Sequence, residues 1–200
     1  MPVWTNELRS FVRRSLFRSS RERWNYDYRR GQWEGLKGDL EVPRLEAVAK
    51  TLTKYTAKPR VLEIGCGEAL VQQRLHQDDY SRWVGVDLSD VIIEKAQRFA
   101  SPAVEYVAAD MREFQTTERF DAILFTESLN YVKKCDRVIE RYFSFLDPNG
   151  VIIVSLFEQT KSPVIWKEVD SILRVLETVV TENKRGKWLC KVLRPRSKNN

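Results

Sequence analysis

Residues 61–69 read Val-Leu-Glu-Ile-Gly-Cys-Gly-Glu-Ala, an apolar run that leads directly into a glycine turn. The apolar run predicts a buried strand, and the helical periodicity that follows predicts a helix near 68–76. Gly65 and Gly67 allow the backbone to approach a ligand closely, because glycine has no Cβ. A glycine turn between a strand and a helix is typical of nucleotide sites, although many such turns bind nothing.

Short apolar runs and longer helical patterns alternate from residue 60 onward. This alternation is typical of βαβ units, so the predicted fold class is α/β with a parallel sheet. The predicted strands are 60–64, 82–86, 104–107, 122–126 and 151–157, and the predicted helices lie near 68–76, 90–100, 133–146 and 163–176. Two further strand-like runs, 176–182 and 187–193, flank Asn183-Lys184-Arg185-Gly186, a turn signal that predicts a terminal antiparallel hairpin.

The N-terminal segment differs in kind from the α/β part. One apolar helical stripe comprises Trp4, Leu8, Phe11, Val12 and Leu16, and a second helix over 42–55, with Pro43 in its first turn, should pack on the sheet. We therefore expect one domain with an N-terminal helical lid over 1–58, a core over 59–195 and a tail over 196–200. The arginine-rich opening also suits a targeting segment or a membrane-surface helix.

The net charge of +6 is concentrated at the two ends of the chain. Arginines crowd residues 1–30, and residues 184–200 contain lysines and arginines but no acid. Such clusters suit an anionic small molecule, nucleic acid or a membrane surface, although a solvated face is the commoner reason for them. The sequence lacks a run of roughly 18 uncharged apolar residues, so we expect a cytoplasmic protein without a transmembrane segment. Cys66, Cys135 and Cys190 lack metal-ligand spacing, and we expect neither disulfides nor a metal site.

Acidic residues end successive predicted strands at Glu63, Asp87 and Asp110, on the edge where open α/β sheets bind ligands. Asp87 suits ribose hydroxyls, a use shared with nicotinamide enzymes. Glu63 would repel a pyrophosphate but attract an ammonium group, and Leu70 replaces the last glycine of GxGxxG, so a nicotinamide dinucleotide is disfavoured. Asp110 followed by Met111 suits adenine, whose amino group can donate to the carboxylate. Each acid alone could simply cap a turn.

Residues 59–157 resemble the class I S-adenosylmethionine-dependent methyltransferases through VLEIGCG, VGVDLS, AADM, FDAILFTESLNYV and LDPNGVIIVS. The resemblance implies a Rossmann-like seven-stranded sheet of order 3-2-1-4-5-7-6 and S-adenosylmethionine as cofactor. It implies that Asp87 holds the ribose, that Asp110 and Met111 hold the adenine, and that Gly65 to Gly67 face the methionine part. Glu63, Cys66, Leu88 and Thr126 complete this part of the expected cofactor site. Ala69 stands where the family often has a third glycine.

A narrower resemblance links Tyr26, Asp27, Trp33, Glu41 and the stretch 120–131 to NodS-type small-molecule N-methyltransferases. Ser128 and Asn130 depart from that pattern, so the resemblance does not identify a substrate. Tyr26, Tyr28 and Trp33 are expected to cover the cofactor, where aromatic rings would attract its sulfonium charge; ordinary packing in the core is the alternative.

Methyl transfer from a sulfonium is an in-line displacement, which a protein accelerates mainly by positioning the reactants. Glu127 and Tyr131 follow the fourth predicted strand and are the candidate catalytic residues for orienting an amine or hydroxyl. His76, the single histidine, is expected at the surface. We expect methylation of nitrogen or oxygen in a small acceptor, including an anionic one. The alternatives are an RNA methyltransferase that uses the basic ends and a non-catalytic binding protein with the same fold.

Overall fold

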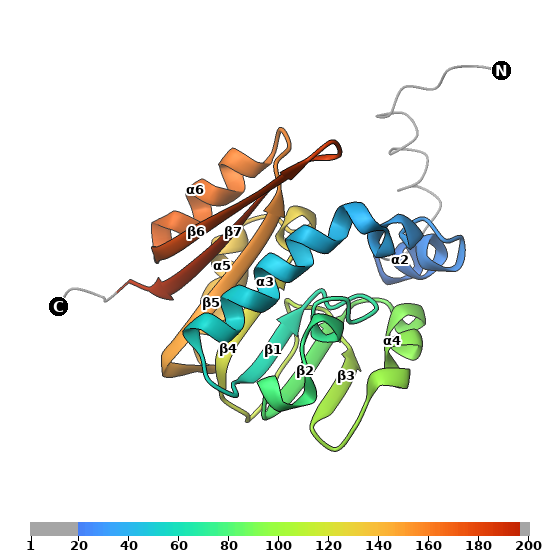
Figure 1. Ribbon diagram of the computed structural model, residues 1–200, viewed down its shortest axis with the longest axis horizontal. Helices are drawn as coiled ribbons and strands as arrows, with labels where there is room; N and C mark the ends of the chain where they lie inside the picture. Colours follow the sequence, from blue (N-terminus) through green and yellow to red (C-terminus); the bar gives the residue numbers. More distant parts are fainter. Residues whose placement is uncertain (1–19, 197–200) are drawn as a thin grey trace.

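The computed structural model describes residues 20–196, which form one seven-stranded sheet flanked by helices (Figure 1). The strands are β1 (Arg60–Ile64), β2 (Arg82–Asp87), β3 (Val104–Ala108), β4 (Phe120–Thr126), β5 (Leu146–Phe157), β6 (Leu173–Asn183) and β7 (Gly186–Pro195). Their order is β3-β2-β1-β4-β5-β7-β6. Strands β1 to β5 pair in parallel, and β7 runs antiparallel to both β5 and β6. The predicted fold class, strand order and terminal hairpin are confirmed.

The α-helices are α2 (Ser20–Arg29), α3 (Val42–Tyr55), α4 (Asp90–Ala96), α5 (Cys135–Tyr142) and α6 (Ser162–Ile172). Short 3-10 helices occupy Glu34–Lys37, Asp39–Glu41, Gln72–Arg74, Gln77–Asp79, Gln97–Phe99 and Leu129–Tyr131. The apolar stripe predicted within residues 4–16 lies outside the described residues, as does the tail beyond residue 196.

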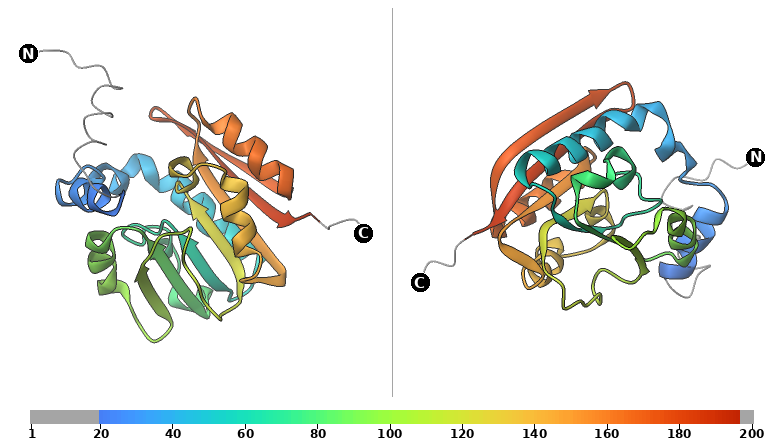
Figure 2. Two further views of the ribbon diagram at one scale, coloured as in Figure 1. Left: turned by 180° about the vertical axis from the view of Figure 1, so that it is seen from behind. Right: turned by 60° about the horizontal axis from the view of Figure 1, so that its bottom comes forward.

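Helices cover both faces of the sheet (Figures 1 and 2). Apolar side chains of α3 and α4 pack with Val61 on one face, and those of α5 and α6 pack with Leu62 on the other. Neighbouring residues of a strand point to opposite faces, so both faces of β1 are buried. This explains why the strands appear in the sequence as continuous apolar runs. The predicted packing of 42–55 on the sheet is confirmed.

The helix predicted near 68–76 is wrong, because the segment forms turns and the 3-10 helix Gln72–Arg74. Ala69 has a φ of 60°, in the left-handed region that a right-handed helix does not contain. The last predicted helix was also too long: α6 ends at Ile172 and β6 begins at Leu173, ahead of the predicted start at Leu176.

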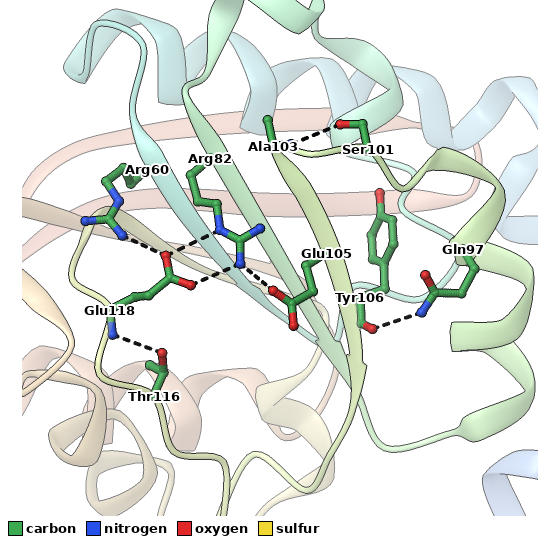
Figure 3. Close-up of polar contacts among 9 residues, drawn as sticks. All are labelled: Arg60, Arg82, Gln97, Ser101, Ala103, Glu105, Tyr106, Thr116 and Glu118. Atoms are coloured by element: carbon green, nitrogen blue, oxygen red, sulfur yellow. Dashed lines mark hydrogen bonds and ion pairs between the residues drawn. The ribbon is translucent and has the colours of Figure 1, made fainter.

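Ion pairs fasten the amino ends of the central strands (Figure 3). Glu118 accepts from Arg60 at 2.6 Å and from Arg82 at 3.0 Å, and Arg82 also pairs with Glu105. Arg60 and Arg82 begin β1 and β2, so this network lies at the edge opposite the glycine turn. Its charges neutralise one another, whereas the carboxyl edge of the sheet carries the candidate site.

Helix α2 lies beside α4 over the carboxyl edge of the sheet (Figure 1). The Asn25 amide oxygen accepts from the Ser89 hydroxyl at 2.6 Å, and its amide nitrogen donates to Asp90 at 3.0 Å. Arg21 pairs with the same aspartate at 2.6 Å. These contacts hold α2 against the start of α4, whose first residue, Asp90, comes three residues after Asp87.

Candidate active site

A cavity of about 630 Å³ opens at the carboxyl edge of the sheet beneath α2. Every predicted site residue lines it, namely Tyr28, Trp33, Glu63, Gly65, Cys66, Gly67, Asp87, Leu88, Asp110, Met111, Thr126, Glu127 and Tyr131. Tyr26 does not line the cavity, and its exposed hydroxyl accepts from Arg30 at 2.7 Å. The expectation that Tyr26 covers the cofactor is therefore wrong. His76 is exposed and outside the cavity, as predicted.

The glycine turn is held in a shape that only glycine fits. Gly65 has a φ of +80°, and a Cβ built on it would lie 2.5 Å from the Cβ of Ser128. Gly67 has a φ of +53°, and its N–H donates to Asp87 at 3.1 Å. Both glycines therefore bring the backbone of the turn to the cavity wall without side-chain bulk.

Asp87 is anchored between the glycine turn and α4. Its second oxygen accepts from the Ser89 N–H at 3.0 Å. Burial raises the pKa of Asp87 to about 6, although the N–H donors of Ser89 and Gly67 lower it. A carboxylate has about four acceptor positions, so Asp87 retains capacity for two hydroxyl donors of a ligand that lies in the cavity.

Glu63 places a nearly solvent-free carboxyl group in the wall of the cavity. Only 1% of the residue is exposed, and its Oε2 has no hydrogen-bond partner within residues 20–196. Burial raises the pKa of Glu63 to about 8, against a smaller lowering by the nearby Thr126 and Trp83 side chains. The Thr126 hydroxyl also has no hydrogen-bond partner among the described residues. Unsatisfied buried polar groups are costly, and a ligand ammonium would satisfy both oxygens.

Arg44 brings a buried positive charge to the same part of the cavity. It is 4% exposed, and its Nε donates to Glu41. In the described part of the chain, we find no other hydrogen bond from its guanidinium. Its positive charge lowers the pKa of Glu63, so the guanidinium lies within electrostatic reach of that carboxyl group. A carboxylate beside a guanidinium complements the ammonium and carboxylate of a free α-amino acid.

Sequence reasoning missed Arg44, although the pattern contained a signal. Positions 41, 44, 45, 48 and 52 share one helical face, and the last three are apolar core residues. A Glu41–Arg44 pair on that face predicts buried charge, which is rare unless it is paired or functional.

Asp110 and Met111 line the part of the cavity that lies just after the end of β3. The Arg112 side chain donates to the Asp110 carboxylate through Nε at 2.9 Å, and this contact lowers the pKa of Asp110. Met111 is partly buried against the core, and its carbonyl accepts from the Tyr142 hydroxyl at 2.8 Å. The pair therefore presents an ionised carboxylate next to an apolar, polarisable side chain.

An aromatic wall, formed by Trp24, Tyr28, Trp33 and Tyr131, lines part of the cavity. Trp24 meets Tyr131 edge-on with ring centroids 4.7 Å apart, and it lies 5.4 Å from Trp33 and 6.1 Å from Tyr28. Tyr131 is 53% exposed, yet partial burial raises the pKa of its phenol, which therefore stays protonated at neutral pH. Sequence reasoning missed Trp24, whose i,i+4 spacing from Tyr28 was the available signal.

Each oxygen of the Glu127 carboxylate accepts one hydrogen bond from β5. The Ser155 hydroxyl donates to Oε1 at 3.0 Å, and the Phe157 N–H donates to Oε2 at 2.7 Å. Glu127 has a φ of 54°, in the left-handed region that non-glycine residues seldom adopt. Glu127 therefore fastens β4 to β5 and also lines the cavity, so its role in orienting an acceptor stays a prediction.

Residues 61–150 match a family described as "Methyltransferase domain". The matched segment contains β1 except its first residue, β2 to β4, and the acids Glu63, Asp87 and Asp110 of the cavity. Residues 61–150 therefore match a methyltransferase domain, and their strands lie within the sheet of order β3-β2-β1-β4-β5-β7-β6.

The fold of this methyltransferase domain is similar to that of solved structures. N-methyltransferase NodS from Bradyrhizobium japonicum WM9, in complex with S-adenosyl-l-homocysteine, superposes with a TM-score of 0.70 at 19% identity. The superposition covers 82% of this chain and 92% of that chain.

Curated relatives share part of the sequence. The ubiquinone biosynthesis O-methyltransferase of Rickettsia felis is 24% identical over 148 residues, which cover 71% of this chain and 59% of that protein. The trans-aconitate 2-methyltransferase of Escherichia coli O139:H28 is 31% identical over 112 residues, covering 54% of this chain and 44% of that protein. The chain thus spans between 44% and 59% of the length of these relatives.

S-adenosylmethionine is the cofactor of this methyltransferase family, and the cavity residues fit it. Glu63 and Arg44 complement its amino-acid end, and Asp87 complements the ribose hydroxyls. Asp110 and Met111 complement the amino group and the face of adenine. The unpartnered buried oxygen of Glu63 is the observation that favours an ammonium-bearing ligand over a dinucleotide.

The basic C-terminal cluster of the methyltransferase domain is largely committed to internal contacts. Arg185 pairs with Glu41 at 2.6 Å, Lys187 with Glu158 at 3.4 Å and Lys191 with Asp170 at 2.9 Å. Such pairing leaves less free charge for nucleic acid than the sequence suggested.

The described helices are all too short or too polar to cross a bilayer. Across residues 20–196, no cluster of three or more His, Cys, Asp or Glu side chains is placed to hold a metal.

Proposed function

We propose that this protein transfers a methyl group from S-adenosylmethionine to nitrogen or oxygen of a small-molecule acceptor. The observation that carries the proposal is the convergence of Glu63, Arg44, Asp87 and Asp110 on one cavity. Each has a distinct partner on the cofactor, and together they distinguish it from other nucleotides. When bound, the cofactor supplies an electrophilic methyl carbon on a positively charged sulfur.

The residues of the chain act mainly by positioning. The amino-acid, ribose and adenine contacts fix the methyl carbon, while the aromatic wall excludes water and stabilises nearby positive charge. With these contacts in place, the cavity would present the methyl carbon of the bound cofactor to the lone pair of the acceptor. We propose that the Tyr131 hydroxyl, protonated at neutral pH, orients the acceptor by donating a hydrogen bond.

The chemistry of the cavity suits an acceptor that needs little help to lose a proton. The single histidine lies elsewhere, and Glu127 is engaged by β5. A neutral amine attacks without prior deprotonation, and an already ionised oxygen does the same. Both classes therefore fit better than an aliphatic alcohol.

Two cations favour an acceptor with an anionic group. Arg23 and Lys133 line the cavity next to the aromatic wall, and neither has a carboxylate partner within residues 20–196. Arg23 is half-buried, lies over Trp24 at 5.9 Å and lowers the pKa of Tyr131, so its charge reaches the acceptor end. A carboxylate on the acceptor would pair with these cations.

The test is transfer of methyl label from S-adenosylmethionine into an extract fractionated into metabolites, RNA and protein. The proposal expects label in the low-molecular-weight fraction, within anionic species that retain an amine or acidic oxygen. An Arg23→Gln, Lys133→Gln variant should lose most of this transfer while binding S-adenosylhomocysteine normally. Label in RNA alone, or no transfer by a protein that binds the cofactor, would refute the proposal.

A further inference from the structure

Glu41 is buried between two arginines from distant parts of the chain. It is 1% exposed, receives the Nε of Arg44 and pairs with Arg185 at 2.6 Å. Glu41 ends the 3-10 helix before α3, and Arg185 lies in the turn between β6 and β7. Figures 1 and 2 both show the tip of this hairpin beside the start of α3.

The position of Arg185 is fixed by the contacts of the hairpin tip. The Asn183 side-chain nitrogen donates to the Leu40 carbonyl at 2.8 Å. The Gly186 backbone lies so close to Phe157 that a Cβ on the glycine would be 2.5 Å from the phenylalanine ring. Phe157 in turn packs on Trp188 with centroids 5.0 Å apart. The hairpin tip is therefore held on the cavity wall, and Arg185 reaches Glu41 from a defined place.

The charges of these groups determine how strongly Arg44 attracts an anion. With Arg44 as its only partner, the buried Glu41 carboxylate would cancel the positive charge of the guanidinium. Arg185 adds a second positive charge, so Glu41, Arg44 and Arg185 together carry a net charge of about +1. The buried carboxyl groups of Glu63 and Glu127 also lie within reach of the Arg44 charge. This makes the contribution of Arg185 to the attraction of a ligand carboxylate larger in proportion. Arg44 also has no further hydrogen bond among the described residues, which leaves its terminal nitrogens for that ligand.

We infer that Arg185 is a positioning residue for the amino-acid end of the cofactor. Arg185 partly neutralises the negative charge of Glu41, so that more of the positive charge of Arg44 is available to bind the methionine carboxylate. This inference rests on the proposed function, because it requires S-adenosylmethionine in the cavity. It assigns to the terminal hairpin a part in cofactor selection, beyond its structural part as the last two strands of the sheet.

Two ligands separate this electrostatic role from a purely structural one. S-adenosylhomocysteine carries the amino-acid group, whereas 5′-methylthioadenosine keeps the adenine, ribose and sulfur but lacks that group. A loss of charge at Arg185 should weaken the first ligand and leave the second unchanged. A loosened lid or cavity should weaken both.

The experiment is calorimetric titration of both ligands into the full chain and its Arg185→Gln, Arg185→Lys and Lys187→Gln variants. We expect Arg185→Gln to weaken S-adenosylhomocysteine about fivefold, the effect of one partly screened charge, with methylthioadenosine affinity unchanged. Arg185→Lys should retain most of the discrimination between the ligands. Lys187→Gln is the matched control, because Lys187 lies on the same hairpin but pairs with the exposed Glu158.

Equal weakening of both ligands by Arg185→Gln would overturn the inference and leave Arg185 a structural contact. Unchanged affinity for both would overturn it as well. If the parent protein binds methylthioadenosine and S-adenosylhomocysteine equally, the Arg44 assignment fails. A parent that binds neither ligand contradicts the proposed function itself, and the inference falls with it.

Discussion

The N–H of Gly67 donates to the Asp87 carboxylate at 3.1 Å, which joins the glycine turn to the end of the neighbouring strand. The turn and the acid therefore form one unit rather than two separate ligand contacts. Under the proposed function, a change at Asp87 would remove a ribose acceptor and would also release the turn that faces the methionine part of the cofactor.

Replacement of Asp87 by alanine should therefore lower cofactor affinity strongly. We expect S-adenosylhomocysteine to bind at least about tenfold more weakly, because charge-assisted hydrogen bonds to the ribose are lost. Calorimetry measures this effect. Asp78→Ala, an exposed acid outside the cavity, is the control and should bind as the parent does. Parent-like affinity in Asp87→Ala would exclude Asp87 from the cofactor site.

Glu63 should make the stability of the ligand-free protein depend on pH. Its pKa rises from 4.5 to about 8 on folding, so the fold favours its protonated form. The stability it contributes is present below the unfolded value and is lost as the pH rises through 8. Thermal unfolding between roughly pH 5 and pH 9 should show a steeper fall in Tm for the parent than for Glu63→Gln. Parallel curves would contradict the buried, unpaired state of this carboxyl group.

Binding should reverse the protonation of Glu63. An ammonium group beside it favours the ionised form, so S-adenosylhomocysteine should release protons near pH 7. Titrations in buffers of different ionisation enthalpy detect this release, which Glu63→Gln should abolish. Heats that do not vary with buffer would show that no ammonium meets Glu63.

Gly65→Ala should abolish binding through strain and steric conflict. The new Cβ would meet Ser128 at 2.5 Å, and the φ of +80° costs a non-glycine residue about 1–3 kcal/mol. Chemical denaturation measures the stability loss, and adding Ser128→Gly should recover only the steric part. Gly35→Ala is the control, since a Cβ there meets nothing within 4 Å. An unstrained, fully active Gly65→Ala protein would contradict the geometry of the turn.

Tyr131→Phe should separate acceptor positioning from cofactor binding. We expect methyl transfer to fall by about tenfold to a hundredfold while S-adenosylhomocysteine affinity stays constant, because one oriented hydrogen bond is lost. Tyr26→Phe, outside the cavity, should behave as the parent in both measurements. Loss of affinity without loss of turnover would place Tyr131 on the cofactor side.

The sheet was predictable because its central strands are buried on both faces and appear as apolar runs in the sequence. The grouping of the acids at the ends of β1, β2 and β3 was also predictable, because the carboxyl ends of parallel strands lie at one edge of the sheet. The helix predicted at 68–76 failed because the left-handed backbone of Ala69 has no signature in composition. Alanine is otherwise the residue that most favours a helix.

Contacts between distant segments explain the remaining differences. The hydrogen bonds that Glu127 accepts from Ser155 and Phe157 of β5 could not be read from sequence spacing. The link from Glu41 to Arg185 joins the lid segment to the last hairpin, and sequence spacing carries no trace of it. Trp24 and Arg44 did have local signals, an aromatic i,i+4 pair and a charge on an apolar helical face.

The central claim is that the cavity selects S-adenosylmethionine and its product over other nucleotides. The most direct measurement is a calorimetric titration of the parent protein with S-adenosylhomocysteine, compared with NAD under the same conditions. Our account predicts saturable binding of S-adenosylhomocysteine with a Kd below about 1 mM, and no detectable binding of NAD. Failure to bind S-adenosylhomocysteine, or equal binding of NAD, would contradict it.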